Sequence, residues 1–352
     1  NRRFSESKIA LSLPSLRVAA VNQEVLREIR SIRKTGFTIA PEAATERLRS
    51  VINKDFSDED YERALKALFN EGWLALKLYF MIGLPTETDE DIEAIRDMAM
   101  KALYIAKRNT GRFVNISITI SPFVPKPHTP FQWYGQISLD EIRRKQKYLK
   151  EILSSKKFKY KGHNEEMSFL EAVFARGDKK LSSLIEKAWE YGCKLDGWSE
   201  MFDFNKWTDA MDKTGINGSY YAKRTFGKDE ELPWDNIDIG IKKDFLWREY
   251  EKALSMERTQ DCKKVCTACG LACKAGVKEI RSWEDKIKTE GKKLRGWEDK
   301  KSQLRNFSTS QLPKIKVRVQ FTKTGKLRYL SHLELVTVIL RGLRRAGVPF
   351  DF

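Results

Sequence analysis

The stretch Lys77-Leu-Tyr-Phe-Met-Ile-Gly-Leu-Pro-Thr-Glu-Thr-Asp-Glu-Asp91 decides the fold. Its first six residues form an apolar, β-rich run of strand length, and Gly83-Leu-Pro85 breaks that run. Thr88, followed three residues later by Asp91, predicts a capped helix N-terminus with acidic residues in the first turn. The connecting turn carries Glu87 at the carboxyl end of a strand, where α/β proteins bind ligands. An ordinary strand-to-helix connection and a ligand site both fit this stretch.

The surrounding sequence repeats the same alternation. Short strands are predicted at residues 9–14, 37–40 and 114–120, and helices at residues 22–33, 45–52, 57–69, 89–108 and 138–154. Alternating strands and helices predict parallel strands joined by right-handed crossovers. Four such strands fit either half of a (β/α) barrel or a doubly wound sheet.

Changes in composition divide the chain into segments. The predicted fold class is α/β, a partial (β/α) barrel of parallel strands. We expect the barrel part at 1–135, an aromatic-rich helical extension at 136–260, a four-Cys motif at 261–274, a charged linker at 275–312 and the start of a small α+β domain at 313–352. The sequence lacks an initiator Met and already reaches a strand at residue 9, and it stops at 348–352 in what resembles an entering strand, so we expect a piece of a longer protein.

The overall charge favours a protein that binds a polyanion, and the apolar patterning argues against a membrane-spanning or secreted protein. A net charge of +17 favours a polyanionic partner, with RNA as the first candidate, although lysines on solvated helix faces explain the charge equally well. No apolar run approaches the roughly 18 residues of a membrane span, and the N-terminus is not a signal peptide. We therefore expect a cytoplasmic protein that has no membrane partner. The aromatic residues of 165–255 predict a packed helical layer, with a base-stacking platform as the alternative.

Four cysteines form the sharpest chemical signal. Cys262, Cys266, Cys269 and Cys273 have the spacing C-x3-C-x2-C-x3-C, which can wrap one tetrahedral Zn²⁺ or one iron–sulfur cluster. Their clustering indicates metal in a reducing compartment rather than a disulfide framework. The short spacing without histidine favours iron–sulfur, and unligated structural thiols are the alternative.

Two carboxylates follow adjacent predicted strands. Glu42 and Glu87 could face one pocket and hydrogen-bond a ribose or an amino group, or they could be solvent-exposed loop acids. His128, His163 and His332 lack a partner at ligand spacing. The remaining cysteine, Cys193, is expected to be buried.

Several motifs resemble known enzymes. Residues 38–49, 77–88 and 121–130 resemble the later strands of radical S-adenosylmethionine (radical SAM) enzymes, most closely the class with a cobalamin-binding domain upstream. Residues 168–171, 176–178, 196–200 and 232–235 are similar to one uncharacterised subfamily, in which a Cys-rich motif follows the barrel. A small radical-SAM-associated domain of unknown function comes next in that subfamily, and residues 321–347 resemble its opening.

The resemblance implies a set of cofactors and contacts. Adenosylmethionine would contact Gly83, Pro85 and Glu87 in the turn, with Glu42 near its ribose or methionyl end, and Ser121 and Pro122 beside its adenine. The family's catalytic [4Fe-4S] cluster binds a C-x3-C-x2-C motif after the first barrel strand, which is expected upstream of this sequence. The resemblance further implies a cobalamin domain upstream and a reductant protein of the flavodoxin or ferredoxin type.

The implied activity is radical chemistry in a transferase. We expect the C-terminal part of a radical SAM enzyme for methyl or related group transfer, with RNA as the favoured substrate, inactive without the cluster-binding strand. The Cys motif would then be an auxiliary iron–sulfur or zinc site. Two alternatives remain open at this point: a permuted catalytic cluster at Cys262–Cys269, and a non-catalytic, metal-stapled RNA-binding protein with a degenerate barrel.

Overall fold

The computed structural model describes residues 36–112, 114–262 and 264–271, together with residues 18, 21, 26, 27 and 29. The chain divides into two compact units, Asn1–Ala275 and Gly276–Phe352, and all of the described residues belong to the first. Five predictions lie outside the described residues: the strand at 9–14, most of the helix at 22–33, Cys273, the linker at 275–312 and the α+β domain at 313–352.

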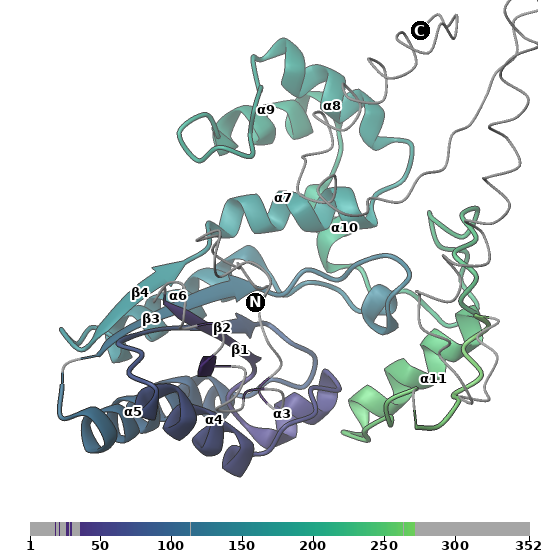
Figure 1. The fold of residues 1–352 in the computed structure, drawn as a ribbon. Helices are drawn as coiled ribbons and strands as arrows, with labels where there is room; N and C mark the ends of the chain where they lie inside the picture. The colour runs from purple at the N-terminus through teal and green to yellow at the C-terminus, as the bar shows by residue number, and fades with distance from the viewer. Residues whose placement is uncertain are drawn as a thin grey trace, which may run out of the picture. The chain divides into compact units, whose positions relative to one another are not determined.

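The described part of the first unit contains a four-stranded parallel sheet (Figure 1). Its strands are β1 (Phe37–Glu42), β2 (Ala75–Ile82), β3 (Asn115–Pro122) and β4 (Phe158–Gly162), and they lie in the order β1-β2-β3-β4. The elements between them are α3 (Glu46–Val51), α4 (Asp58–Asn70), α5 (Asp89–Thr110), the 3-10 helix η2 (Pro130–Trp133) and α6 (Leu139–Ile152). Successive strands are neighbours, and the order of the described strands does not reverse as it does in a doubly wound sheet. The predicted α/β class is confirmed, and the topology is consistent with a partial barrel.

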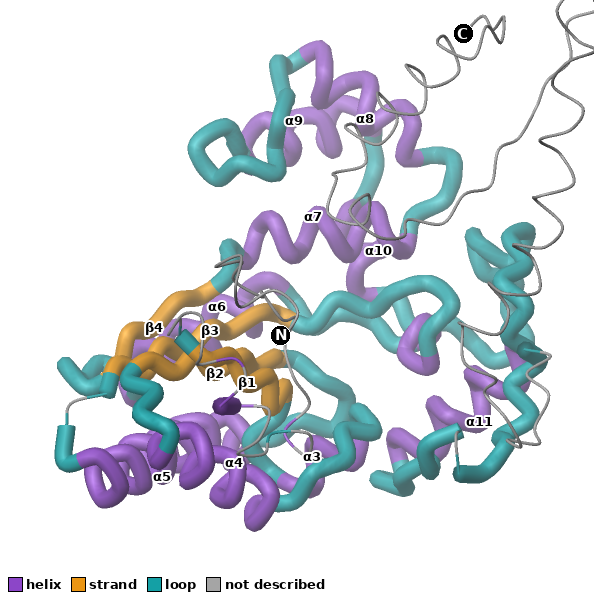
Figure 2. The backbone as a smooth tube through the Cα atoms, viewed as in Figure 1, coloured by secondary structure: helices purple, strands orange, loops and turns teal. Residues whose placement is uncertain are grey.

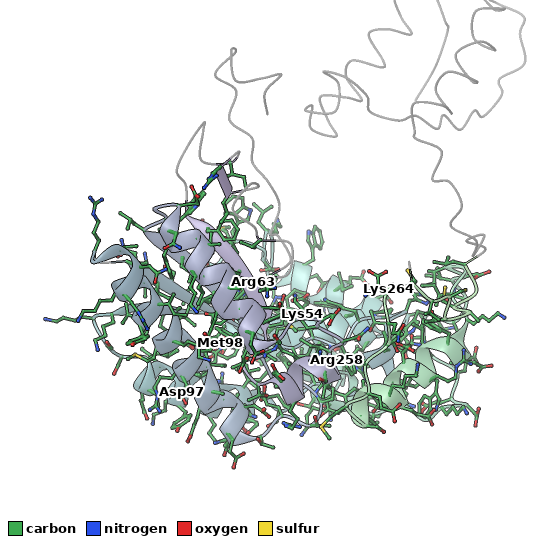
Figure 3. The ribbon with its side chains drawn as sticks, turned by 60° about the horizontal axis from the view of Figure 1, so that its bottom comes forward. Lys54, Arg63, Asp97, Met98, Arg258 and Lys264 are labelled. Atoms are coloured by element: carbon green, nitrogen blue, oxygen red, sulfur yellow. The ribbon has the colours of Figure 1, made fainter. Side chains whose placement is uncertain are left out.

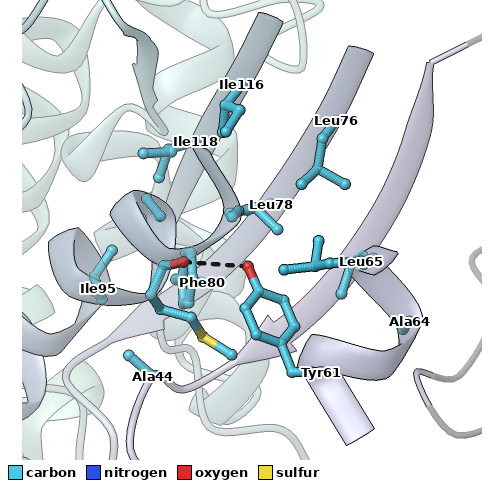
Figure 4. Packing of buried hydrophobic residues seen from close by; sticks show 14 of the residues in the cluster. Ala44, Tyr61, Ala64, Leu65, Leu76, Leu78, Phe80, Ile95, Ile116 and Ile118 are labelled. Carbon is cyan, nitrogen blue, oxygen red and sulfur yellow. Dashed lines mark hydrogen bonds between the residues drawn. The ribbon is translucent and has the colours of Figure 1, made fainter. Parts of the chain in front are cut away.

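The core lies between the sheet and the helices α4 and α5. Alternate residues of β2, among them Leu76, Leu78 and Phe80, are buried on this face, as the pleat of a strand requires (Figure 4). Tyr61 of α4 crosses to α5 and donates a hydrogen bond from its hydroxyl to the Met98 carbonyl at 3.3 Å. Burial raises the pKa of this tyrosine well above its usual range.

The predicted helix starts are confirmed at their caps. Ser57 and Asp60 form the capping box of α4, and Thr88 and Asp91 form that of α5. Gly111 ends α5 in the left-handed region with φ +61°.

The sheet continues beyond residue 135, where we expected the helical extension to begin. Ile142 and Leu149 of α6 pack into the sheet core, and β4 pairs in parallel with β3. The sequence did not reveal β4 because the strand has five residues, two of which are the exposed Lys159 and Lys161.

Beyond β4, every regular element of the described chain is a helix, as predicted, and loops connect these helices (Figure 2). The helices are α7 (Glu165–Arg176), α8 (Leu181–Glu190), α9 (Phe204–Thr214), α10 (Gly218–Lys223) and α11 (Lys243–Leu254). The aromatic residues were expected to pack in a helical layer. Phe169, Trp207 and Trp234 are buried, as this expectation requires, whereas Trp189 and Trp198 are more than half exposed. None of the helices in the described part of the chain has the length and apolar character needed to cross a membrane.

Candidate functional site

Three of the seven non-glycine residues with positive φ in the described chain lie at or after the carboxyl ends of strands. Glu42 ends β1 with φ +66°, Thr86 follows β2 with φ +65°, and His128 lies in the proline-rich loop after β3 with φ +56°. Residues other than glycine adopt such angles at an energetic cost, and these angles cluster at ligand sites. Gly83, with φ +81°, supplies a fourth left-handed residue at the same edge of the sheet.

The buried carboxylate of Glu87 hydrogen-bonds to the backbone of its own turn, residues 83–87 after β2. Glu87 exposes 2% of its side chain, and its Oε1 accepts hydrogen bonds from the Gly83 N–H at 2.8 Å and from Lys145 Nζ at 2.6 Å. Burial raises the pKa of Glu87, and the charge of Lys145 opposes that rise. Its second oxygen, Oε2, is buried without a hydrogen-bond partner.

A second cation reaches this turn from α3. Arg47 donates hydrogen bonds to the Thr86 carbonyl at 2.9 Å and to its hydroxyl at 3.2 Å, and it forms an ion pair with Asp91. Thr45 donates to Asp91 Oδ1 at 2.5 Å. Although burial opposes the shift, hydrogen bonds from Thr45, Thr88 and Arg47 hold the pKa of Asp91 below its usual value.

The other predicted cofactor contacts flank the turn in register. Ser121 pairs with Met81 and Pro122 pairs with Ile82, so the two lie beside the last two residues of β2, which precede Gly83. Pro85 is buried within the turn itself. The structure thus gathers the segments around Gly83, Pro85, Glu87, Ser121 and Pro122 at one edge of the sheet.

The two carboxylates have different surroundings. Glu42 is 28% exposed and lies 3.5 Å from Lys54 Nζ, whereas Glu87 is buried and bonded to its own turn. Glu42 therefore presents a partly open carboxylate at the strand ends, and Glu87 acts on the backbone of the turn.

An apolar cluster covers part of this edge. Leu84 and Phe123, from the connections after β2 and β3, pack with Ala253 of α11; the other members are Ala43, Leu48, Ile52, Val51, Met81 and Phe131. The cluster attaches α11, more than 100 residues later in the chain, to the strand ends.

The residues just before the four-Cys motif contact α3 and the connection that follows it. Arg258, labelled in Figure 3, donates from Nε to the Ser50 hydroxyl at 3.0 Å and lies 3.7 Å from Asp55. The Thr259 N–H donates to Asn53 Oδ1 at 3.2 Å. Farther along, the Cys269 carbonyl accepts a hydrogen bond from the Lys242 N–H at 2.8 Å. The segment is therefore anchored near the strand-to-helix unit that carries Glu42.

The described cysteines are free thiols. Cys262 and Cys266 are exposed, Cys269 is half-buried, and Cys193 is buried, as predicted. Within residues 36–271 as described, no three His, Cys, Asp or Glu side chains converge on a point that could hold a metal ion. Because Cys273 lies outside the described residues, the four-Cys metal site stays a prediction.

Some site residues were not predicted from the sequence. Lys145 and Arg47 were missed because a charged residue on a helix ordinarily faces solvent. A signal was available for Lys145, since it falls in line with the buried Ile142 and Leu149 at positions i+3 and i+7 of one helix face. None of the histidines was predicted as a site residue: His128 lies in the proline-rich loop after β3, His163 is exposed, and His332 lies outside the described residues.

Substitution of Gly83 tests the turn directly. We expect Gly83→Ala to lower the free energy of unfolding by about 2 kcal/mol, because alanine is strained at φ +81° and its Cβ would lie 2.8 Å from Ile137 Cδ1. The measurement is urea unfolding beside Gly111→Ala, which has a similar φ of +61° and open space around its Cβ. Equal losses in the two variants would show that contact with Ile137 adds nothing.

Sequence comparisons agree with this geometry. Residues 3–99 match the profile described as the Radical SAM superfamily, and this range contains β1, β2, Glu42 and the turn at 83–87. Residues 316–352 match the profile of an uncharacterised protein conserved in bacteria, DUF2344.

One curated relative shares a longer region. An uncharacterised protein of Methanocaldococcus jannaschii is 34% identical over 178 residues, which are 51% of this chain and 37% of that protein. The match therefore spans little more than a third of the relative's length. No solved structure matches the chain.

Proposed function

We propose that this chain is part of a radical SAM enzyme that binds adenosylmethionine at the carboxyl ends of β1, β2 and β3. The observation that carries the proposal is the strained turn at residues 83–87, which lies inside the region that matches the Radical SAM profile. When bound, adenosylmethionine and a [4Fe-4S] cluster would supply a carbon-centred radical. The cluster's catalytic ligands are proposed to lie upstream of this sequence.

The residues of this chain would bind and orient the cofactor. The backbone of residues 83–86 would contact adenosylmethionine, with the half-open Glu42 carboxylate near its ribose or methionyl end. Ser121 and Pro122, in register with Met81 and Ile82, would border the adenine. Buried apolar residues at the same edge, such as Leu84, would limit the access of water.

The proposed reaction is methyl or related group transfer, with RNA as the substrate. The net charge of +17 supports a polyanionic substrate, and the resemblance to enzymes with an upstream cobalamin domain supports methyl transfer. The four cysteines at 262–273 would hold an auxiliary iron–sulfur or zinc centre. A reductant protein of the flavodoxin or ferredoxin type would deliver electrons.

The test is reductive cleavage of adenosylmethionine. The protein expressed from its complete reading frame is purified without oxygen, reconstituted with iron and sulfide, and mixed with dithionite and adenosylmethionine. We expect 5′-deoxyadenosine and methionine to form, at least tenfold more slowly in Gly83→Val than in the control Gly197→Val, whose added side chain starts in open space. A folded, iron-loaded protein that forms no 5′-deoxyadenosine would contradict the proposal, and steeply salt-dependent RNA binding would then support the non-catalytic alternative.

Metal analysis tests the auxiliary site in the 352-residue chain alone. We expect about four irons with matching sulfide after anaerobic purification, lost in a Cys266→Ser, Cys269→Ser variant. Cys193→Ser is the matched control, since this cysteine is buried among the apolar side chains of the α7–α10 region. One zinc without iron would instead identify a structural metal site, and no metal would contradict the assignment.

A further inference from the structure

A buried ion pair joins α6 to the turn after β2. Lys145 exposes 8% of its side chain and Glu87 exposes 2%, and their charged atoms lie 2.6 Å apart. Burying two charges is costly, and leaving one of them without its partner is more costly still. The pair therefore constrains where the Glu87 side chain can lie.

The remaining charged neighbours lie on α6 and in the loop before it. Glu141, one turn earlier in α6, is 3.8 Å from Lys145 Nζ and 35% exposed. Tyr134 lies near enough for the Glu87 charge, together with burial, to raise the pKa of its hydroxyl. Lys145 is thus the close cationic partner of Glu87 among the described residues.

The carboxylate of Glu87 transmits this constraint to the backbone. Its Oε1 receives both Lys145 Nζ and the N–H of Gly83, the first residue after β2. Ile137, just before α6, packs against the other side of Gly83, where a Cβ would lie 2.9 Å from Ile137 Cγ1. The α6 region therefore contacts the turn in two places, through Lys145 at Glu87 and through Ile137 at Gly83.

We propose that Lys145 is a positioning residue for adenosylmethionine, which acts by holding Glu87 beneath the turn so that the backbone of residues 83–86 faces the ligand. The inference rests on the proposed function and deepens it. The resemblance implies that Glu87 contacts the cofactor. Because Glu87 is buried and bonded to Gly83, its role is instead to support the turn. Lys145 in turn holds Glu87 in place.

The experiment uses three variants and one control in the protein from its complete reading frame. Lys145→Met leaves the Glu87 carboxylate buried without its cation. Lys145→Met combined with Glu87→Gln removes both charges but keeps an amide oxygen that can accept from the Gly83 N–H. Glu87→Gln alone completes the double-mutant cycle. Arg144→Met is the control, because Arg144 neighbours Lys145 in sequence but is 50% exposed and pairs with Glu141 and Asp89 at the surface.

The first readout needs no ligand. Hydrogen exchange of the backbone amides of residues 83, 84 and 86–88 should be at least tenfold faster in Lys145→Met than in the wild type, and close to wild type in the double variant and in Arg144→Met. Unchanged exchange in Lys145→Met would overturn the inference. The double variant keeps the test decisive if the single variant folds poorly.

The second readout is the affinity for adenosylmethionine between pH 6 and pH 8, measured by calorimetry. We expect Lys145→Met to bind at least tenfold more weakly at pH 8 and to recover at pH 6, where the unpaired carboxyl can take up a proton. The double variant should bind within about threefold of wild type at both values. Faster exchange with wild-type affinity would show that the pair stabilises the turn without positioning the ligand, and would overturn the proposal.

The two proposals fail in distinguishable ways. A wild-type protein that does not bind adenosylmethionine would overturn the proposed function and, with it, the positioning role. Wild-type binding and cleavage together with a Lys145→Met variant unchanged in both readouts would overturn the positioning role alone.

Discussion

Replacing Arg176 with methionine should lower the free energy of unfolding by about 4 kcal/mol. The side chain is 1% exposed, and its guanidinium donates to four main-chain carbonyls, those of Gln132, Tyr134, Tyr221 and Arg224. Methionine would leave these acceptors, the buried Gln132 carbonyl among them, without this donor, and a buried acceptor left unpaired costs about 1–3 kcal/mol before the structure relaxes.

The charge of Arg176 survives its burial. Burial, with the nearby charge of Arg224, lowers the pKa of Arg176 to about 10, so the side chain stays protonated at neutral pH. Its guanidinium also lies over the Phe226 ring, 4.8 Å from the centroid. Urea unfolding at pH 7 measures the loss, with the exposed Arg144→Met expected to change stability by less than about 1 kcal/mol. A loss for Arg176→Met as small as that of the control would contradict this account.

Gly135→Ala should be destabilising by about 3 kcal/mol, through contact with the backbone rather than through strain in φ. A Cβ at Gly135 would lie 2.0 Å from the Lys223 carbonyl oxygen and 2.6 Å from its carbon. Neither atom belongs to a flexible side chain, so the two chain segments would have to separate. Gly197→Ala, with no atom within 4 Å of the added Cβ, is the matched control for unfolding by urea.

These two substitutions act on one junction. The Gln136 N–H donates to the Ala222 carbonyl at 2.8 Å, and the Phe226 N–H donates to the Trp133 carbonyl at 2.9 Å. The junction joins the loop after β3 to the segment around α10. Because both changes open the same contact, their combined effect should be smaller than the sum of the separate losses. Strict additivity would show that the two sites are independent.

Local signals in the sequence predicted much of the fold. The capping boxes at Ser57 and Thr88 located α4 and α5 because a cap depends on residues three apart in the chain. The runs at 37–40, 77–82 and 114–120 located three strands because each has an apolar residue at every second position or more often. β4 escaped notice because its place in the sheet depends on pairing with β3, which lies 36 residues earlier.

The sequence predicted where the candidate site lies but not which side chains hold it in place. The strand ends could be found from the Gly-Leu-Pro turn, but the burial of Glu87 depends on Lys145, 58 residues later. The structural role of Arg176 could not be predicted either, since its four partners are main-chain carbonyls that carry no sequence signature. Contacts of this kind come from tertiary packing, which periodicity does not encode.

The short strand β4 has a consequence for how molecules of this protein meet one another. It forms one edge of the described sheet, and its exposed side chains are Lys159 and Lys161. A strand from a second molecule that paired here would have to be brief and would meet two ammonium groups at close range. Pairing with a second molecule is therefore disfavoured at this edge of the described sheet, which lowers its tendency to aggregate.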